Sequence, residues 1–154
     1  MHKRFNVRVY GILVEQSKLL VSDEFIKGKE ICKLPGGGLE FGEGPAECIV
    51  REFKEETNLN VAVQSHFYTT DFFVTSAFDI KSQVISIYYT VKALEKIKLQ
   101  VSTKRFDFKK KVEGAQSFRW IEIDKISEND FTFVIDRKVA TLIAEQKKLF
   151  LNEK

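Results

Sequence analysis

Three glutamates stand close together in a stretch of the sequence whose apolar spacing predicts a helix. Glu52, Glu55 and Glu56 are three or four residues apart, so in a helix Glu52 is a neighbour of both others. Each like-charge pair costs about 0.2–0.5 kcal/mol, and carboxylates in a last helical turn face the negative end of the helix dipole. A bound divalent cation relieves this repulsion, so the three glutamates are a candidate metal site.

The residues around the glutamates predict a helix that starts at Pro45 and ends before Asn58. Pro45 suits the first helical position, Gly44 is an acceptable N-cap, and Asn58 tolerates the left-handed conformation that ends many helices. An apolar stripe on this helix is expected to pack on a core, and its members are Ala46, Ile49, Val50 and Phe53. Glycines in the preceding loop allow its backbone to approach a ligand closely, and they are Gly36, Gly37 and Gly38.

This loop and helix resemble the signature of the Nudix hydrolase family, in which a glycine, a glutamate and an Arg-Glu-x-x-Glu-Glu cluster stand at set spacing. The positions that this chain keeps are Gly37, Glu43, Arg51, Glu52, Glu55, Glu56 and Leu59. Phe53 stands where the family has an aliphatic residue, and Asn58 stands where it has glycine. Phe53 keeps the apolar packing and Asn58 accepts the left-handed conformation, so neither departure threatens the chemistry.

The resemblance implies hydrolysis of a nucleoside diphosphate linked to another group X, by water attack at phosphorus. It implies Mg²⁺ as the cofactor, with Mn²⁺ as a substitute ion, because hard oxygen ligands and phosphates suit these cations. Carried over by position, Glu55 and Glu56 bind the metal, and the Gly37 carbonyl is a further ligand. Glu52 binds a metal or acts as the general base, and the resemblance leaves both roles open.

Other residues of the signature are expected to orient these groups or to bind substrate. The resemblance implies that Arg51 holds Glu52 or a neighbouring carboxylate in place and that Glu43 braces the loop. The substrate-binding backbone would be that of Gly36, Gly37 and Gly38. A carboxylate from outside the signature often completes such sites, and Glu113 is the candidate because it precedes an expected strand. An ordinary solvated glutamate in a polar loop is an equally good interpretation of Glu113.

Apolar alternation and β-branched residues predict strands over residues 5–14, 18–22, 84–91 and 118–123, and one or two strands within residues 61–74. A last amphipathic helix is expected to carry Val139, Leu142, Ile143 and Phe150 on one face. The order of strands, helix, strands and helix favours an α/β or α+β sandwich with mixed strands between helices. The resemblance sharpens this expectation to a Nudix-like α/β/α sandwich with a mixed sheet and two main helices.

Length and composition agree with one hydrolase domain over residues 1–154. The chain is 44% hydrophobic and 31% charged, which is enough for a proper core. Its net charge of +3 suits a small anionic nucleotide substrate without requiring nucleic acid. Cys32 and Cys48 form no disulfide framework or metal motif, so we expect two reduced thiols in a cytoplasmic protein. No apolar run is long enough to span a bilayer, so no membrane partner is expected, whereas a homodimer is common for the fold.

Two further groups of residues are candidates for substrate contact. Residues 104–111 interleave basic and aromatic side chains, which suits steering phosphates or stacking a base, although such a run is more often a solvated loop. Aromatic side chains in the expected strands could also stack a base, and they are Tyr68, Phe72, Phe73, Tyr88 and Tyr89. About half of them must face the core, because successive side chains of a strand point to opposite faces.

Two other functions use the same residues differently. A non-catalytic Nudix-like regulator would bind a nucleotide metabolite and could lose the metal carboxylates, but Glu52, Glu55 and Glu56 are all present. RNA end processing would favour a strong basic stripe, for which a net charge of +3 is thin support. We therefore rank the enzyme first, with a nucleoside triphosphate or similar small nucleotide slightly favoured over ADP-ribose, dinucleoside polyphosphates and nucleotide sugars.

Overall fold

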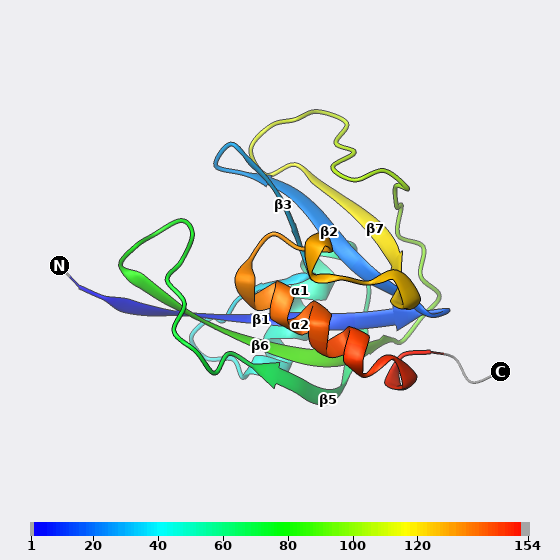
Figure 1. Ribbon diagram of the computed structural model, residues 1–154, viewed down its shortest axis with the longest axis horizontal. Helices are drawn as coiled ribbons and strands as arrows, with labels where there is room; N and C mark the ends of the chain where they lie inside the picture. Colours follow the sequence, from blue (N-terminus) through cyan, green and yellow to red (C-terminus); the bar gives the residue numbers. More distant parts are fainter. Residues whose placement is uncertain (1, 152–154) are drawn as a thin grey trace. The chain divides into compact units, whose positions relative to one another are not determined.

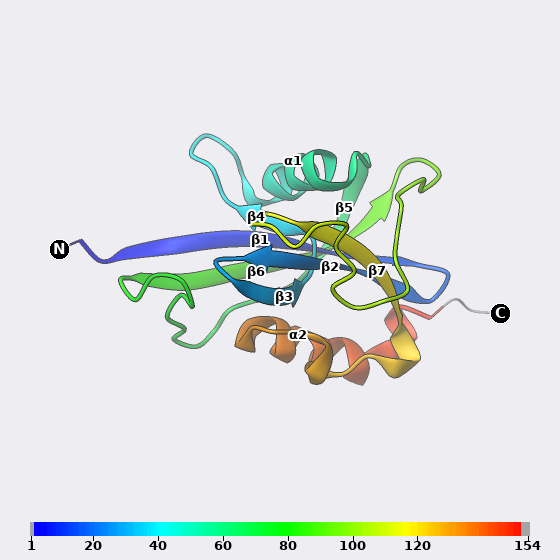
Figure 2. The same ribbon diagram turned by 90° about the horizontal axis from the view of Figure 1, so that it is seen from above.

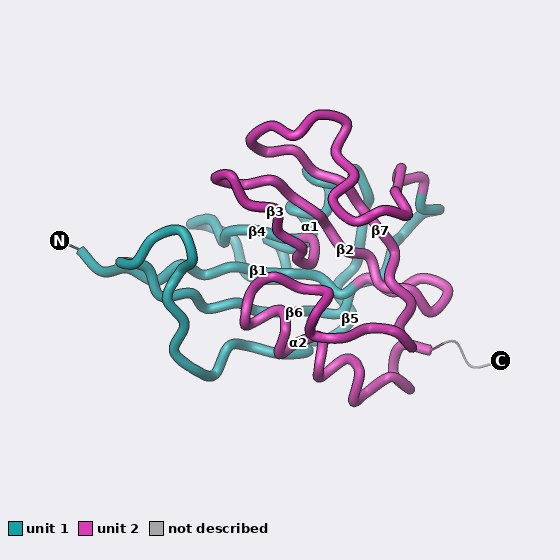
Figure 3. Tube along the Cα trace, turned by 45° about the horizontal axis from the view of Figure 1, so that its top comes forward, with its two compact units in different colours: residues 1–12, 36–97 teal, residues 13–35, 98–154 magenta. Residues whose placement is uncertain are grey.

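The computed structural model describes residues 2–151 (Figure 1). By their internal contacts they form two compact units, shown in different colours in Figure 3. Unit 1 is Met1–Ile12 with Gly36–Ile97, and unit 2 is Leu13–Pro35 with Lys98–Lys154. Within the part of the chain that is described, no helix has both the length and the apolar character needed to cross a membrane.

Unit 1 contains the first part of strand β1 (Arg4–Glu15), together with β4 (Gly36–Gly38), α1 (Pro45–Thr57), β5 (Val61–Thr69) and β6 (Ser82–Ala93). Strand β4 pairs with β1 in antiparallel register, and β6 lies beside β1 and pairs with β5. Helix α1 contacts β4, β5 and β6, and Figure 2 shows it lying along these strands. The ring of Phe53 on α1 packs where a side chain on Gly11 would otherwise stand, so Gly11 lets the helix approach β1.

Unit 2 is built around strand β2 (Lys18–Ile26), which pairs in antiparallel register with β3 (Lys29–Lys33) and with β7 (Gln116–Glu122). The short helices η1 (Ile123–Lys125) and η2 (Glu128–Asp130) precede helix α2 (Val134–Glu145), and η3 (Lys147–Leu149) follows it. Helix α2 contacts η1 and η2 and buries an apolar face that includes Ile135, Val139 and Ile143.

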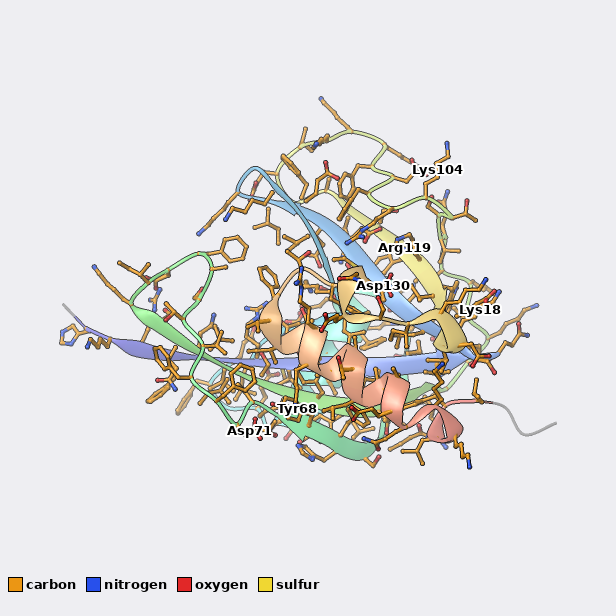
Figure 4. The ribbon with its side chains drawn as sticks, in the orientation of Figure 1. Lys18, Tyr68, Asp71, Lys104, Arg119 and Asp130 are labelled. Carbon is orange, nitrogen blue, oxygen red and sulfur yellow. The ribbon has the colours of Figure 1, made fainter. Side chains whose placement is uncertain are left out.

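A buried ion pair holds a long loop of unit 2, residues 98–115. Asp23 on β2 is fully buried, and both of its carboxylate oxygens accept hydrogen bonds from Arg119 on β7, which is labelled in Figure 4. The same carboxylate accepts the backbone N–H of Phe106 at 3.0 Å. Phe106 has a φ of 55°, a conformation that is rare for a bulky residue, so the buried carboxylate stabilises an otherwise unfavourable turn of this loop.

The expected strands are present, with some differences at their ends. Strand β5 ends at Thr69, so the expectation of strand structure up to residue 74 is wrong. Beyond this point the Tyr68 hydroxyl donates a hydrogen bond of 2.7 Å to Asp71. The strands β3 and β4 were not predicted. Strand β4 consists of three glycines, which carry no strand signal. Helix α2 ends at Glu145, so Phe150 lies beyond the helix, next to η3.

Candidate functional site

Helix α1 begins and ends where the sequence predicts. Gly44 is the N-cap with extended backbone angles, Pro45 is the first helical residue, and the carboxylate of Glu47 accepts the Gly44 N–H at 3.2 Å. Asn58 ends the helix in the left-handed conformation, with a φ of 60°, and its N–H bonds to the Lys54 carbonyl. The residues that determine the length of α1 are therefore local, which explains why its bounds could be predicted.

The buried face of α1 differs from the predicted stripe. Ala46 and Val50 are exposed, so their assignment to the core is wrong, and the buried residues of the helix are Cys48, Ile49, Phe53 and Thr57. The buried face is therefore rotated about the helix axis toward positions 52 and 56. Because of this rotation the Glu52 side chain is only 14% exposed, and it borders the packed face of α1 instead of lying a third of a turn away.

The glycines of β4 let its backbone approach these carboxylates. A Cβ added to Gly37 would lie 2.6 Å from Cδ and Oε1 of Glu52, so only glycine leaves room for this carboxylate. The backbone N–H of Gly36 donates to Glu56 Oε2 at 3.1 Å. Gly36 is also required by the backbone, because it has a φ of 149° and its Cβ would meet the Val9 carbonyl oxygen at 2.1 Å. Thus β4 places two carboxylates of α1 directly beside main-chain atoms.

Arg51 binds the carboxylates around it. Its Nε and Nη2 donate to the two oxygens of Glu43 at 2.9 and 2.6 Å, a bidentate arrangement. Its Nη1 donates to Glu52 at 2.9 Å and to Glu55 at 3.2 Å. The hydrogen bonds from Arg51 and from the Glu40 backbone lower the pKa of Glu43 from 4.5 to about 2, and the hydrogen bond with Glu43 raises the pKa of Arg51. The guanidinium therefore stays charged and links the loop before α1 to the helix.

Two residues near Arg51 were not predicted to be part of the site. Glu40 lies 3.6 Å from Arg51 Nη1, although its side chain is 68% exposed. Cys48 is fully buried and lies 3.6 Å both from the Gly38 carbonyl and from Arg51 Nη2. Burial, followed by the hydrogen bond with Glu43, raises the pKa of the Cys48 thiol to about 12, so it remains a neutral thiol. The helical spacing of Cys48 three residues before Arg51 was the available signal.

The donor chemistry of the glutamates suits a hard divalent cation. Glu52 and Glu56 both lie against the backbone of β4, and carboxylate oxygens are ligands that suit Mg²⁺. In residues 2–151, however, no three acidic, histidine or cysteine side chains converge as a set that could hold an ion. Glu55, 59% exposed, instead pairs with Arg51. A metal that used all three glutamates would therefore compete with Arg51 for Glu55.

The remaining candidates lie elsewhere. Glu113 belongs to unit 2, where both of its carboxylate oxygens accept the Lys27 N–H, at 3.0 and 2.8 Å. This contact holds the turn between β2 and β3, in which Lys27 and Gly28 have positive φ angles. Glu113 thus stabilises a turn in the structure. Its role as a metal ligand stays a prediction.

The rings of the basic and aromatic run pack within unit 2. Phe106 lies 6.3 Å from Phe108, which lies 6.4 Å from Phe25, measured between ring centroids. Arg105 lies over one end of this row and Lys111 over the other. Next to the row is a cavity of about 610 Å³, formed by residues 100–102, 107–110, 112 and 115–118. The rings make packing and cation–π contacts with one another and with basic side chains. We therefore interpret this run as a structured surface loop and not as a base-stacking site.

Among the aromatic residues of the expected strands, Tyr88 is fully buried, and the centroid of its ring lies 6.3 Å from that of Tyr68. Burial and the Asp71 carboxylate raise the pKa of the Tyr68 hydroxyl to about 12, and Figure 4 shows Tyr68 and Asp71 side by side. Phe72 and Phe73 are 40% and 73% exposed. Tyr88 is thus a core residue, whereas Phe72 and Phe73 stay candidates for substrate contact.

The close approach of Gly37 to Glu52 leads to a first testable prediction. We expect Gly37→Ala to lower kcat/KM by about ten- to a hundredfold with little loss of thermal stability, because the new Cβ displaces a flexible carboxylate and not the backbone. In Gly36→Ala the Cβ would meet backbone, so that variant should lose stability instead. Gly44→Ala is the matched control, since its nearest contact is the tip of Glu47 at 3.2 Å. Wild-type kcat/KM in Gly37→Ala would contradict the prediction.

A family model described as NUDIX domain matches residues 2–142. No curated protein matches the sequence.

Several solved structures are similar to this chain. A NUDIX hydrolase from Nitrosomonas europaea is 19% identical, with a TM-score of 0.67 over 93% of this chain and 90% of its own. A MutT protein from Methanosarcina mazei is 18% identical, with a TM-score of 0.69 over 96% and 99% of the two chains. An ADP-ribose pyrophosphatase from Streptococcus suis is 16% identical, with a TM-score of 0.60 over 93% and 92%. These similarities confirm the expected fold class, an α/β fold with a mixed sheet and two main helices.

Proposed function

Because this chain belongs to the Nudix hydrolase family, a family of pyrophosphohydrolases, we propose that it cleaves a nucleoside diphosphate linked to another group X. Mg²⁺ is its proposed cofactor. Mn²⁺ is proposed as a substitute ion. The observation that carries the proposal is the placement of Glu52 and Glu56 against the glycine backbone of β4, with Arg51 bound to the adjacent carboxylates. Carboxylate oxygens, together with substrate phosphates, are ligands that Mg²⁺ prefers.

The proposed metal ligands are Glu52, Glu55, Glu56 and the carbonyl of Gly37. A divalent cation bound there would neutralise phosphate oxygens and lower the pKa of an attacking water. Arg51 orients Glu52 and also binds Glu55, so a cation bound to Glu55 would have to displace Arg51 from this carboxylate. Glu43 keeps the guanidinium in place through its bidentate contact.

Glu52 has two proposed roles, metal ligand or general base. Its Oε1 accepts a hydrogen bond from Arg51 at 2.9 Å, which fixes the orientation of the carboxylate for either role. As a base it would take a proton from the attacking water at a carboxylate oxygen, and as a ligand it would share the cation with Glu56. The glycines of β4 bring the substrate phosphates close to main-chain atoms in both cases.

The substrate is proposed to be a small nucleotide. One similar structure is described as an ADP-ribose pyrophosphatase, so ADP-ribose belongs in a substrate panel beside the nucleoside triphosphates that we favour slightly from the sequence. Nucleotide sugars and dinucleoside polyphosphates complete the panel, because each contains a pyrophosphate linkage.

A phosphate-release screen of this panel tests the proposed function. We expect one substrate class to be hydrolysed with Mg²⁺ or Mn²⁺, and at least about a hundredfold less with EDTA, because the carboxylates alone repel an anionic substrate. Added pyrophosphatase or phosphatase locates the cleaved bond from the product formed. The double variant Glu55→Gln/Glu56→Gln, purified in the same way, controls for contaminating phosphatases. Tight binding of a nucleotide without its hydrolysis in the presence of Mg²⁺ or Mn²⁺ would overturn the proposal in favour of a non-catalytic regulator.

A further inference from the structure

The face of the sheet in unit 1 that borders Glu52 can be followed along β1. A Cβ on Gly11 would meet side chains of α1. Gly37, where a Cβ would meet Glu52, is paired with Val9 and therefore shares its face. Side chains of a strand alternate between its two faces, so Phe5 lies on the same face as Val9 and Gly11. Val9 is fully buried, whereas Phe5 is 67% exposed. The face that borders the proposed cation site is therefore open at Phe5.

The same face continues across the neighbouring segments of unit 1. Tyr10 follows Val9 in β1, so its ring lies on the face away from α1. The ring of Tyr88 on β6 lies 5.3 Å from that of Tyr10 and shares this face. Gln83 is five positions before Tyr88, so it lies on the α1 face, and it forms a bridge with Thr75. Figure 1 shows the first residues of β1 beside the start of β6.

A cavity of about 390 Å³ opens on this face, and Phe5, Gln83 and Thr75 all line it. A second aromatic side chain, Phe73, also lines it and is 73% exposed. Exposed basic residues at its border are Lys3 and Lys81. Exposed rings, an amide and positive charges around one cavity suit a planar aromatic group that is joined to an anion.

The position of the cavity relative to Glu52 also fits a nucleotide. Phe5 is four residues before Val9, so along β1 it lies about 13 Å from the point opposite Gly37. An extended nucleotide spans a distance of this order between its base and its second phosphate. A ligand with its phosphates at the proposed cation site could therefore place its base in the cavity without leaving this face of the sheet.

We propose that this cavity, the Phe5/Phe73 cavity, binds the base of the nucleotide substrate. The base stacks on the rings of Phe5 and Phe73, and the amide of Gln83 bonds to its edge. The inference deepens the proposed function and rests on it, because the phosphates then extend along β1 toward Glu52. Phe5 and Phe73 are in this view residues for substrate binding, so their loss should affect KM more than kcat.

Kinetics of variants with the substrate found in the screen give the first test. We expect Phe5→Ala and Phe73→Ala each to raise KM about tenfold while kcat changes less than about threefold. Phe73→Tyr keeps a ring and should stay close to the wild type. Leu94→Ala is the control, because Leu94 is 61% exposed and follows the other end of β6. Unchanged KM in both alanine variants of the cavity would overturn the proposal.

Calorimetric titration gives a second readout that does not need turnover. The probes are AMP, GMP, CMP and UMP, and ribose 5-phosphate is the matched probe without a base. We expect the wild type and Leu94→Ala to bind at least one of these nucleotides about tenfold more tightly than ribose 5-phosphate. This preference should largely disappear in Phe5→Ala and Phe73→Ala. Equal affinity of the wild type for ribose 5-phosphate and all four nucleotides would overturn the base site.

Sedimentation velocity tests a different occupant of the cavity, a second copy of this chain. A wild-type dimer that becomes a monomer in Phe5→Ala and Phe73→Ala, with the preference for a base unchanged, would overturn the proposal. The cavity would then be an interface between subunits. Failure of the proposed function is a separate result, namely that the wild type hydrolyses no member of the panel, whereas binding of a base is measured without hydrolysis.

Discussion

We expect Glu56→Gln to lower turnover by at least about a hundredfold while the protein keeps its fold. The amide oxygen of Gln can still accept the Gly36 N–H that Glu56 accepts at 3.1 Å, so β4 should stay in place. What is lost is the negative charge, and with it a proposed metal ligand. Turnover with saturating Mg²⁺ and the midpoint of thermal unfolding are the two measurements.

The same loss is expected for Glu55→Gln, for a different structural reason. Glu55 is 59% exposed, and such ion pairs contribute little to stability, so its 3.2 Å contact with Arg51 can be lost at small cost. Removing the charge also relieves its repulsion with Glu52. Glu47→Gln is the matched control, because it makes the same substitution on the same helix and keeps an acceptor for the Gly44 N–H. Retained turnover in both Glu55→Gln and Glu56→Gln would remove the proposed metal site.

The parts of the molecule that sequence could predict are those that depend on neighbouring residues. The bounds of α1 follow from Gly44, Pro45 and Asn58, and each of these acts within one turn of the helix. The position of its buried face could not be read in the same way. Val50 fits an apolar stripe but is 38% exposed, because the strands under α1 contact Ile49 and Phe53 instead. Which face a helix buries depends on its partners as well as on its own sequence.

Features that depend on strand pairing could not be predicted from local sequence for the same reason. Strand β4 consists of three glycines and exists because it pairs with β1, whose register brings Arg8 opposite Gly38. Arg8 and Gly38 are 30 positions apart in the sequence, so no local pattern connects them. The ion pair of Asp23 with Arg119 in unit 2 is a similar case, since it links β2 to β7. Its effect on residues 98–115 becomes visible only through the bond from the Phe106 N–H.

Replacing Arg51 with Ala should reduce both activity and stability. The variant leaves Glu43 and Glu52, each only 14% exposed, without the guanidinium that pairs them. Close carboxylates without a counter-charge repel each other and lose the positions that they hold in the folded protein. We expect kcat/KM to fall at least about tenfold, together with a lower midpoint of denaturant unfolding. Arg51→Lys should restore the charge but not the bidentate contact with Glu43, and so give an intermediate result.

The pH dependence of stability separates this role of Arg51 from a loss of packing. The pKa of Glu43 is lowered from 4.5 to about 2 in the folded protein, so its ion pair contributes stability above about pH 4.5. This contribution is lost as the pH falls from 4.5 toward 2, because Glu43 then binds a proton. The stability difference between wild type and Arg51→Ala should therefore be constant from pH 7 to 5 and shrink below pH 4.5. A stability difference between wild type and Arg51→Ala that does not change with pH would mean that Arg51 acts through packing. Lys54→Ala is the control, because it removes a positive charge elsewhere on α1.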